Sequence, residues 1–376
     1  MKIVLAPDSF KGSLTSAQAS EAMEKAIHSV DSRIETIVKP MADGGEGTLE
    51  ALLKATKGER VSFTCRGPLG DDSESSFVEI EDEGAVIEGA NISGLPMVPR
   101  EKRNPDLTTT YGMGEAILHA LDRGNKQFII GLGGSSTNDG GLGMLQALGM
   151  KAFDANGKPV GPFGKDIFQV DTVDLNFVDP RLKDVTIKVA CDVDNPLTGE
   201  RGASHVYGPQ KGATSDQIEA YDKALGKYGR LIEQATDRQF ANEEGAGAAG
   251  GLGFAFLAIG AELHSGAKLV SDAIGLAAAI QQADLVITGE GQSDVQTLYG
   301  KAPGYVANLA TTFGKPAILL SGSLEGDLRK MNEMFSGCFS IVPGPRTLAE
   351  CMNEGEGYLY EACRQLTHLF IKLMKE

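Results

Sequence analysis

The alternation of short apolar runs with longer amphipathic segments constrains the fold of this chain most strongly. Runs such as KIVLA (residues 2–6), ADLVITG (283–289) and PAILLSG (316–322) are short, apolar and partly β-branched, as buried strands are. Residues 15–30 and 214–236 have helical periodicity instead, and Thr15 and Gln18 fit a capping box at the start of the first of these helices. Because strands that alternate with helices form parallel sheets covered by those helices, we expect an α/β fold.

The length and the pattern together predict two domains. The chain has 376 residues, and a domain usually holds roughly 100–200 residues. The alternation is cleanest near both ends, whereas the middle of the chain has more glycine loops. We therefore expect a discontinuous Rossmann-like domain with a parallel sheet from residues 1–65 and 285–376, and an inserted second α/β domain from residues 66–284. The active site is expected in the cleft between these two domains.

Composition limits the partners and the location of the protein. A net charge of −16 argues against nucleic acid and anionic membranes, since both attract basic patches. The five cysteines are odd in number and form no C-x-x-C pair, which favours a reducing cytoplasm over a secreted disulfide framework. No apolar span reaches transmembrane length. We expect a cytoplasmic protein, and the sequence leaves its oligomeric state open, a homodimer included.

Acidic side chains follow five of the predicted strands. Ligands of open α/β sheets bind beyond the carboxyl ends of the strands. A single Asp beside glycine is usually only a turn former, but five such positions favour a functional cleft. Magnesium would offset their mutual repulsion, because it prefers oxygen ligands and retains water or phosphate oxygens. The strand-end acids are Asp8, Asp43, Asp139, Asp192 and Glu290, with Asp294 shortly after the last of them.

A glycine-rich stretch, GLGGSSTNDGG (residues 131–141), separates an apolar run from a helix-like run. Such a turn directs backbone N–H groups at one point, and the positive end of the helix dipole adds to an anion site there. A second interpretation is a tight connection in which Asn138 or Asp139 caps the helix. Both interpretations can be correct, because a helix cap and an anion site use the same backbone amides. The expected phosphate-binding residues are Gly133, Gly134, Ser135, Ser136, Thr137 and Asn138.

Three lysines and a second glycine-rich segment lie in or beside loops of this kind. Lys11, Lys211 and Lys301 each lie in or beside a glycine-containing loop, where a lone lysine would otherwise be merely solvated. The segment GAGAAG (residues 245–250) fits G-x-G-x-x-G but follows no convincing strand, so helix packing or nucleotide contact is favoured over dinucleotide binding. An NAD-dependent hydroxy-acid oxidoreductase and a non-catalytic sugar-phosphate sensor remain as alternatives.

Several segments together resemble the bacterial type-1 glycerate kinases, and the resemblance covers nearly the whole chain. It implies a kinase that phosphorylates D-glycerate with ATP and magnesium in the breakdown of glycerate and related organic acids. Whether the 2- or the 3-hydroxyl is phosphorylated stays undecided. One departure is visible: where the family commonly has an arginine and an apolar residue, this chain has Gln292 and Ser293. The matching segments are APDSFKGSL, PMADGGEGT, GLGGSSTNDGG, ACDVDNPLTG, GPQKGA, GAGAAGGLG and TGEGQSDVQTLYGKAP.

Phosphoryl transfer depends on positioning and charge neutralisation more than on covalent chemistry. On that basis we expect Asp192 to accept the proton of the glycerate hydroxyl, with Asp8 as its rival. Lys11 and Lys301 would offset charge that develops on the transferred group. The remaining expected roles are magnesium binding by Asp43 and Asp294, with Glu290 as a further ligand, phosphate binding by Gly133 to Asn138, and binding of the substrate carboxylate or hydroxyls by Ser9 and Lys211.

Overall fold

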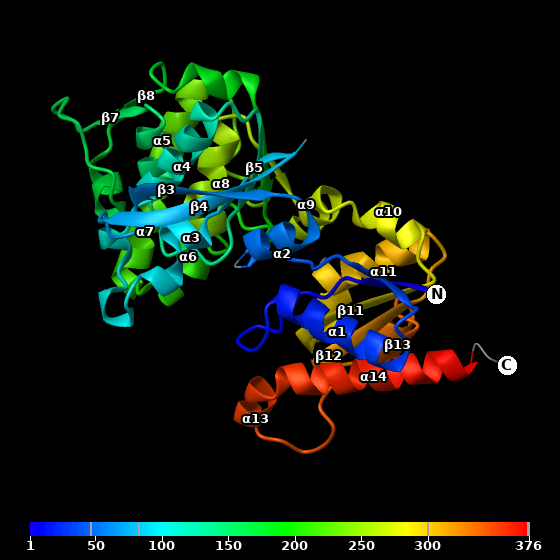
Figure 1. Ribbon diagram of the computed structural model, residues 1–376. Coiled ribbons are helices and arrows are strands. Elements are labelled where there is room, and N and C mark those ends of the chain that lie inside the picture. The colour runs from blue at the N-terminus through cyan, green and yellow to red at the C-terminus, as the bar shows by residue number, and fades with distance from the viewer. Residues whose placement is uncertain (46, 82, 299–300, 374–376) are drawn as a thin grey trace. The chain divides into compact units, whose positions relative to one another are not determined.

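The computed structural model describes residues 1–45, 47–81, 83–298 and 301–373. The chain forms two compact units, each built on a sheet with parallel strands and covering helices (Figure 1), which confirms the predicted α/β class. Unit 1 contains residues 1–43, 50–57 and 267–376, and unit 2 contains residues 44–49 and 58–266.

The sheet of unit 1 has five parallel strands in the order β13-β12-β11-β1-β2. One face packs against α1 and α14, whose apolar side chains share a core with β1, β11 and β12, and α11 contacts β11 and β12 (Figure 1). The helix α1 begins with the predicted capping box between Thr15 and Gln18. The strands are β1 (Lys2–Leu5), β2 (Glu35–Val38), β11 (Leu285–Ser293), β12 (Ala317–Leu324) and β13 (Gly337–Ser340).

Helices connect these strands in the order that the sequence pattern predicts. The helix α2 starts in residues assigned to unit 2 and continues into unit 1, and α9 begins at the last residue of unit 2. The helices are α1 (Ser16–Val30), α2 (Thr48–Ala55), α9 (Gly266–Ala273), α10 (Leu276–Gln281), η7 (Val295–Leu298), α11 (Ala302–Thr312), α12 (Leu328–Asn332), α13 (Leu348–Asn353) and α14 (Gly355–Leu373).

The sheet of unit 2 has six strands in the order β10-β9-β6-β5-β4-β3 and is mixed. The pairs from β5 to β10 are parallel, whereas β3, β4 and β5 pair antiparallel. Their connections, residues 67–71 and 81–83, are too short for a parallel crossover. The strands are β3 (Glu59–Arg66), β4 (Asp72–Ile80), β5 (Gly84–Glu88), β6 (Gln127–Gly131), β9 (Thr186–Ala190) and β10 (Glu262–His264), and β7 (Lys151–Phe153) pairs separately with β8 (Thr172–Asp174).

A single large apolar core holds unit 2 together and draws on both its sheet and its helices. Helix α4 packs on α5 and β3, and α7 packs on α8. The helices are α3 (Ala90–Ser93), η1 (Leu95–Met97), η2 (Arg100–Lys102), η3 (Pro105–Leu107), α4 (Tyr111–Asp122), α5 (Leu142–Ala147), η4 (Gly164–Gln169), η5 (Pro180–Asp184), α6 (Ala203–Tyr207), η6 (Pro209–Lys211), α7 (Ser215–Thr236) and α8 (Ala248–Ala258).

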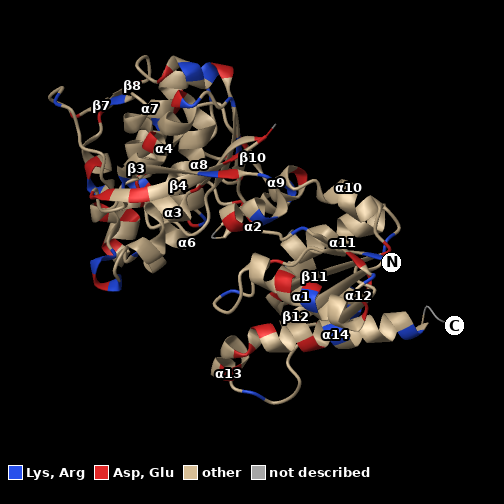
Figure 2. Cartoon of the chain, in the orientation of Figure 1, with Lys and Arg blue, Asp and Glu red and all other residues tan. Residues whose placement is uncertain are grey.

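The two units divide at somewhat different residues from the predicted domains. Strand β3 falls in the range predicted for the first domain, but it pairs with β4 and therefore lies in unit 2. Residues 267–284, predicted for the inserted domain, lie in unit 1. Within the described parts of the chain, no helix has the length and apolar character needed to cross a bilayer. In the view of Figure 2, basic side chains are scattered among acidic ones.

Candidate functional site

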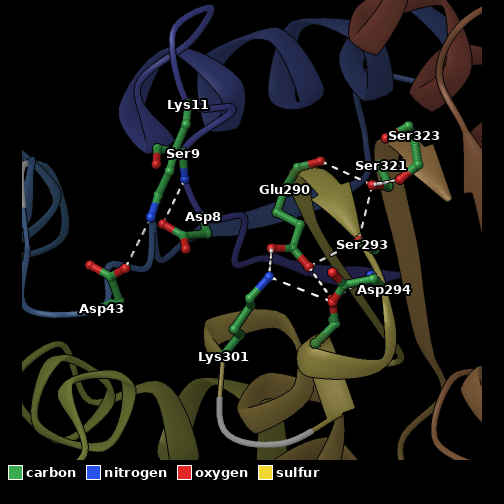
Figure 3. Close-up of polar contacts among 11 residues, drawn as sticks. Asp8, Ser9, Lys11, Asp43, Glu290, Ser293, Asp294, Lys301, Ser321 and Ser323 are labelled. Carbon is green, nitrogen blue, oxygen red and sulfur yellow. Dashed lines mark hydrogen bonds and ion pairs between the residues drawn. The ribbon is translucent and has the colours of Figure 1, made fainter. Parts of the chain in front are cut away.

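Acidic residues from three separate segments gather near the carboxyl ends of three neighbouring strands of the unit 1 sheet (Figure 3). Asp8 follows β1, Asp43 follows β2, and Glu290 lies in β11. Strand β1 pairs with β11 on one side and with β2 on the other, so their carboxyl ends share one edge of the sheet. The sequence placed Glu290 just after a strand, whereas β11 continues to Ser293 because it stays paired with β12.

Asp8 is the most strongly perturbed carboxyl group of this edge. It is 8 % exposed, and its Oδ1 accepts a hydrogen bond of 2.7 Å from the backbone N–H of Ser9. Burial raises the pKa of Asp8 to about 7, and the nearby charges of Asp43 and Glu290 act in the same direction. A carboxyl group that titrates near neutral pH is suited to accept a proton in catalysis.

Lys11 lies at the tip of the tight turn that follows β1. Its exposed ammonium group is 3.3 Å from Oδ2 of the half-buried Asp43 (Figure 3). The negative charge of Asp43 raises the pKa of Lys11, which keeps the lysine cationic at neutral pH. The turn therefore adds a solvent-facing positive charge to an edge that is rich in carboxylates.

Two hydroxyl groups hold the carboxylate of Glu290, which is only 6 % exposed. Its Oε1 accepts hydrogen bonds from Thr297 at 2.6 Å and from Ser293 at 2.9 Å, and the Ser293 hydroxyl also lies 2.9 Å from that of Ser321 (Figure 3). Burial raises the pKa of Glu290, while these hydrogen bonds lower it. The sequence reasoning missed all three hydroxyl residues, and only the departure from the family pattern at Ser293 marked the position.

Lys301 is directed at the same carboxylate from the start of α11. Its Nζ lies 4.0 Å from Oε2 of Glu290 and 3.8 Å from Oδ1 of Asp294. Lys301 is partly exposed, so these long ion pairs add little to stability. They instead leave an ammonium group beside two carboxylates, one buried and one half-buried.

The donor chemistry of this edge suits magnesium, although it is not a cage made of protein ligands alone. Within residues 1–45, 47–81, 83–298 and 301–373, no cluster of three or more His, Cys, Asp or Glu side chains is arranged to hold a metal ion. Magnesium is usually bound by one or two carboxylates together with water and substrate phosphates. Asp43, Glu290 and Asp294 provide such oxygens.

The second group of predicted residues lies in unit 2, where β6 ends and the loop of residues 132–141 begins. A side chain at Gly133 would approach Cα of Gly45 to 2.6 Å, and one at Gly131 would overlap the carbonyl oxygen of Gly44. These two glycines therefore permit close packing of one glycine-rich loop against another. The packing of this neighbouring loop accounts for glycine at these two positions.

Residues Ser135 to Asn138 are buried, and their polar side chains lie inside unit 2. The hydroxyl of Ser136 donates to the carbonyl of Ser93, and the Asn138 amide donates to Ser204 Oγ at 3.0 Å. Among the described residues, Thr137 Oγ1 and Asn138 Oδ1 are buried atoms without a hydrogen-bond partner. Because buried polar atoms are nearly always paired, the loop fits a ligand or an ordered water that supplies partners.

Lys211 lies behind this loop and not on an open surface. It is 2 % exposed, and its Nζ donates to Ser135 Oγ at 3.0 Å and to the Thr137 carbonyl at 2.5 Å. Burial lowers the pKa of Lys211 to about 7, and the nearby Asp139 opposes that change. The sequence placed Lys211 beside the substrate but gave no sign that the loop would enclose its ammonium group.

Two buried carboxylates of unit 2 hold backbone segments in place. Asp139 is fully buried and accepts hydrogen bonds from Thr110 and from the amides of Gly141 and Gly143 at the start of α5. Glu88, which the sequence reasoning did not single out, is 2 % exposed and accepts from the amides of Gly47 and Leu49. Glu88 ends the apolar run of β5, so the strand-end rule could have found it.

Asp192 differs from Asp8 in its surroundings. It follows β9 in unit 2, is exposed, and accepts a hydrogen bond of 2.9 Å on Oδ1 from the amide of Gly266. That contact places the carboxylate at the first residue of α9. Asp192 thus lies after a strand as predicted, in the unit that also contains the loop of residues 132–141.

The GAGAAG segment packs its backbone against that same loop. Ala249, Gly250 and Gly251 have φ values of 53°, 75° and 89°, so the chain is left-handed for three residues near the start of α8. The carbonyl of Gly250 accepts from the Gly140 amide at 3.0 Å, and a side chain at Gly250 would overlap the carbonyl of Thr137. The partner of this packing is a loop, whereas the sequence favoured helix packing or nucleotide contact.

Known proteins match the chain over its full length. The family model described as "Glycerate kinase family" matches residues 3–371. A glycerate kinase from Halalkalibacterium halodurans is 46 % identical, with 97 % of each chain covered. A glycerate 2-kinase from Escherichia coli K12 is 44 % identical, again with 97 % of each chain covered. A crystal structure assigned to glycerate kinase 2 of Salmonella typhimurium LT2 matches with a TM-score of 0.90 and 41 % identity over 100 % of both chains.

These matches run through both units, so the α/β fold described above is that of a kinase. More narrowly, the chain belongs to the glycerate kinase family, which confirms the resemblance carried by its motifs. Membership of a kinase family favours phosphoryl transfer over the oxidoreductase and the sugar-phosphate sensor that the sequence left open.

Proposed function

We propose that this protein transfers the γ-phosphoryl group of ATP to a hydroxyl group of D-glycerate in the cytoplasm. The names of its relatives support the substrate, and the acidic edge of unit 1 supports the chemistry. The observation that carries the proposal is the buried Asp8, whose pKa of about 7 lies near neutral pH and which lies close to Lys11, Asp43 and Glu290. Strongly perturbed carboxyl groups cluster at functional sites, which favours a catalytic role for Asp8.

Asp8 is our candidate for the general base. Its carboxylate would accept the proton of the attacking glycerate hydroxyl, whose oxygen then forms the bond to the γ-phosphorus while the bond to the ADP oxygen breaks. The raised pKa makes Asp8 a better proton acceptor than an ordinary aspartate near neutral pH. Asp192, the first choice from sequence, is exposed. We keep it as the rival for this role.

The proposed reaction requires that negative charge on the phosphates be neutralised. We assign Lys11 and Lys301 to the charge that develops on the transferred group, because each ammonium already lies beside carboxylates of this edge. Asp43 and Asp294, with Glu290, would hold magnesium through carboxylate oxygens. When bound, magnesium would neutralise phosphate charge and align the phosphate oxygens.

We assign the loop from Gly133 to Asn138 to the phosphates of ATP. Its support is the pair of unpartnered polar atoms on Thr137 and Asn138, together with hydroxyl groups on adjacent residues. Ser9, next to the proposed base, is the candidate for binding the glycerate carboxylate or a hydroxyl group. We further propose the 2-hydroxyl as the acceptor, because a relative with 44 % identity is named glycerate 2-kinase.

An ADP-release assay tests the function directly. The purified protein should release ADP only when ATP, a divalent cation and D-glycerate are all present. Omission of D-glycerate is expected to reduce the rate by at least tenfold, because bulk water is poorly placed to replace the bound alcohol. A parallel mixture with NAD and D-glycerate should show no change in absorbance at 340 nm. Equal ADP release with and without D-glycerate would refute this substrate.

A further inference from the structure

The turn that contains Lys211 is built to bring this side chain inward. Pro209 begins the short helix η6, and Gly212 follows with a φ of 85°. A side chain at Gly212 would overlap the carbonyl oxygen of Arg103, so the turn is held tightly against its neighbour. The side chain of Lys211 therefore lies in the interior of unit 2, where it is one of the largest fully buried side chains.

The ammonium group of Lys211 bridges two points of the loop. It donates to Ser135 Oγ at 3.0 Å and to the Thr137 carbonyl at 2.5 Å, so it spans Ser136. The peptide bond after Thr137 is trans, as are all described peptide bonds. In a trans peptide the C=O and the next N–H point in opposite directions. The Thr137 carbonyl that faces Lys211 thus turns the Asn138 N–H away from it.

Charge gives Lys211 a second effect on the loop. Residues 131–143 contain no Lys or Arg and include the fully buried Asp139. The electrostatic interaction between Asp139 and Lys211 favours the charged lysine. Burial raises the pKa of Asp139, whereas its hydrogen bonds from Thr110, Gly141 and Gly143 lower it and favour the charged form.

We propose that Lys211 is a positioning residue that fixes Ser135 to Asn138 in the form that binds the phosphates of ATP. The inference rests on the proposed function of this loop and replaces the sequence-based assignment of Lys211 to the glycerate carboxylate. It distinguishes Lys211 from Lys11 and Lys301, whose ammonium groups are accessible.

The test compares Lys211→Met with Lys227→Met. Lys227 is an exposed lysine of the same unit that pairs with Asp171 at 2.9 Å and has no part in the loop. Lys211→Met should raise the KM for ATP at least tenfold and leave the KM for D-glycerate within about twofold. Its thermal midpoint should fall, because Ser135 Oγ and the Thr137 carbonyl lose their buried donor, so the kinetic constants are measured at a temperature at which circular dichroism shows the variant to be folded. Lys227→Met should change neither constant.

Two further measurements distinguish a failure of the Lys211 proposal from a failure of the variant to fold and from a wrong substrate. Ser135→Ala keeps the lysine and removes one acceptor, so a rise in the KM for ATP is expected there even if Lys211→Met does not fold. The proposal is overturned if both variants bind ATP normally, or if Lys211→Met raises the KM for D-glycerate instead. Calorimetric titration with ATP measures the expected loss of ATP affinity in the absence of turnover. If the wild-type protein binds ATP but does not phosphorylate D-glycerate, the proposed substrate is refuted, whereas the proposed role of Lys211 is not.

Discussion

Asp8→Asn is expected to reduce kcat by about 10²–10⁴, the usual contribution of a well-placed general base. Asparagine keeps an oxygen that can accept from the Ser9 amide, so the local geometry should survive while the proton acceptor is lost. The KM for ATP should change little. Steady-state kinetics with ATP and D-glycerate at pH 8 measure both constants.

The same variant should be more stable than the wild type in alkaline solution. The pKa of Asp8 is about 7 in the folded protein against 3.8 in the unfolded reference, so the folded state binds the proton more tightly. Stability therefore falls as pH rises from about 4 to about 7 and stays lowered above that range, by an amount on the order of 4 kcal/mol. Asp8→Asn removes this penalty, so its advantage in urea unfolding should be present at pH 8 and absent near pH 4.

Asp192→Asn provides the matched comparison for the base. It removes an exposed carboxylate but retains an oxygen for the Gly266 amide. If Asp8 is the base, Asp192→Asn should lower kcat by less than tenfold. A loss of 10²–10⁴ in Asp192→Asn, together with near-normal turnover in Asp8→Asn, would return the role to Asp192.

Gly250→Ala should destabilise the protein by about 2–5 kcal/mol, the sum of left-handed strain and overpacking. The residue has a φ of 75°, and its new side chain would overlap the Thr137 carbonyl and approach Asn138 Cα to 2.7 Å. Because these atoms belong to the loop assigned to phosphate, the KM for ATP should rise as well. Urea unfolding and steady-state kinetics report the two effects separately.

Gly157→Ala isolates the backbone contribution. Gly157 lies in the same unit with a φ of 76°, but nothing lies within 4 Å of its added side chain. This variant should lose only about 1–2 kcal/mol and retain its affinity for ATP. Equal behaviour of Gly250→Ala and Gly157→Ala would mean that GAGAAG does not shape the loop.

Local sequence patterns predicted most elements of the fold because those elements are determined by neighbouring residues. The capping box at Thr15 and Gln18 and the buried strand at residues 2–5 are examples. The antiparallel pairing of β3 and β4 was not predicted, since both directions of pairing suit the same apolar pattern. The extension of β11 through Glu290 was missed for a similar reason: it depends on the partner strand β12.

Those parts of the candidate site that lie at strand ends or in glycine-rich loops could be predicted from the sequence. That rule identified Asp8, Asp43 and Glu290, which the sheet order of unit 1 brings to one edge. It could not foresee that Ser293 and Thr297 hold Glu290, or that Lys211 is buried. Those contacts depend on where side chains point after the chain has folded, which spacing in the sequence does not encode.

A ³¹P NMR spectrum of the reaction tests the central claim most directly. Wild-type protein with ATP, magnesium and D-glycerate should convert the γ-phosphate resonance into a phosphomonoester signal that coincides with added 2-phosphoglycerate. Asp8→Asn, at the same concentration and over the same time, should leave the ATP resonances intact. Unchanged ATP with the wild type, or wild-type product formation by Asp8→Asn, would contradict the account.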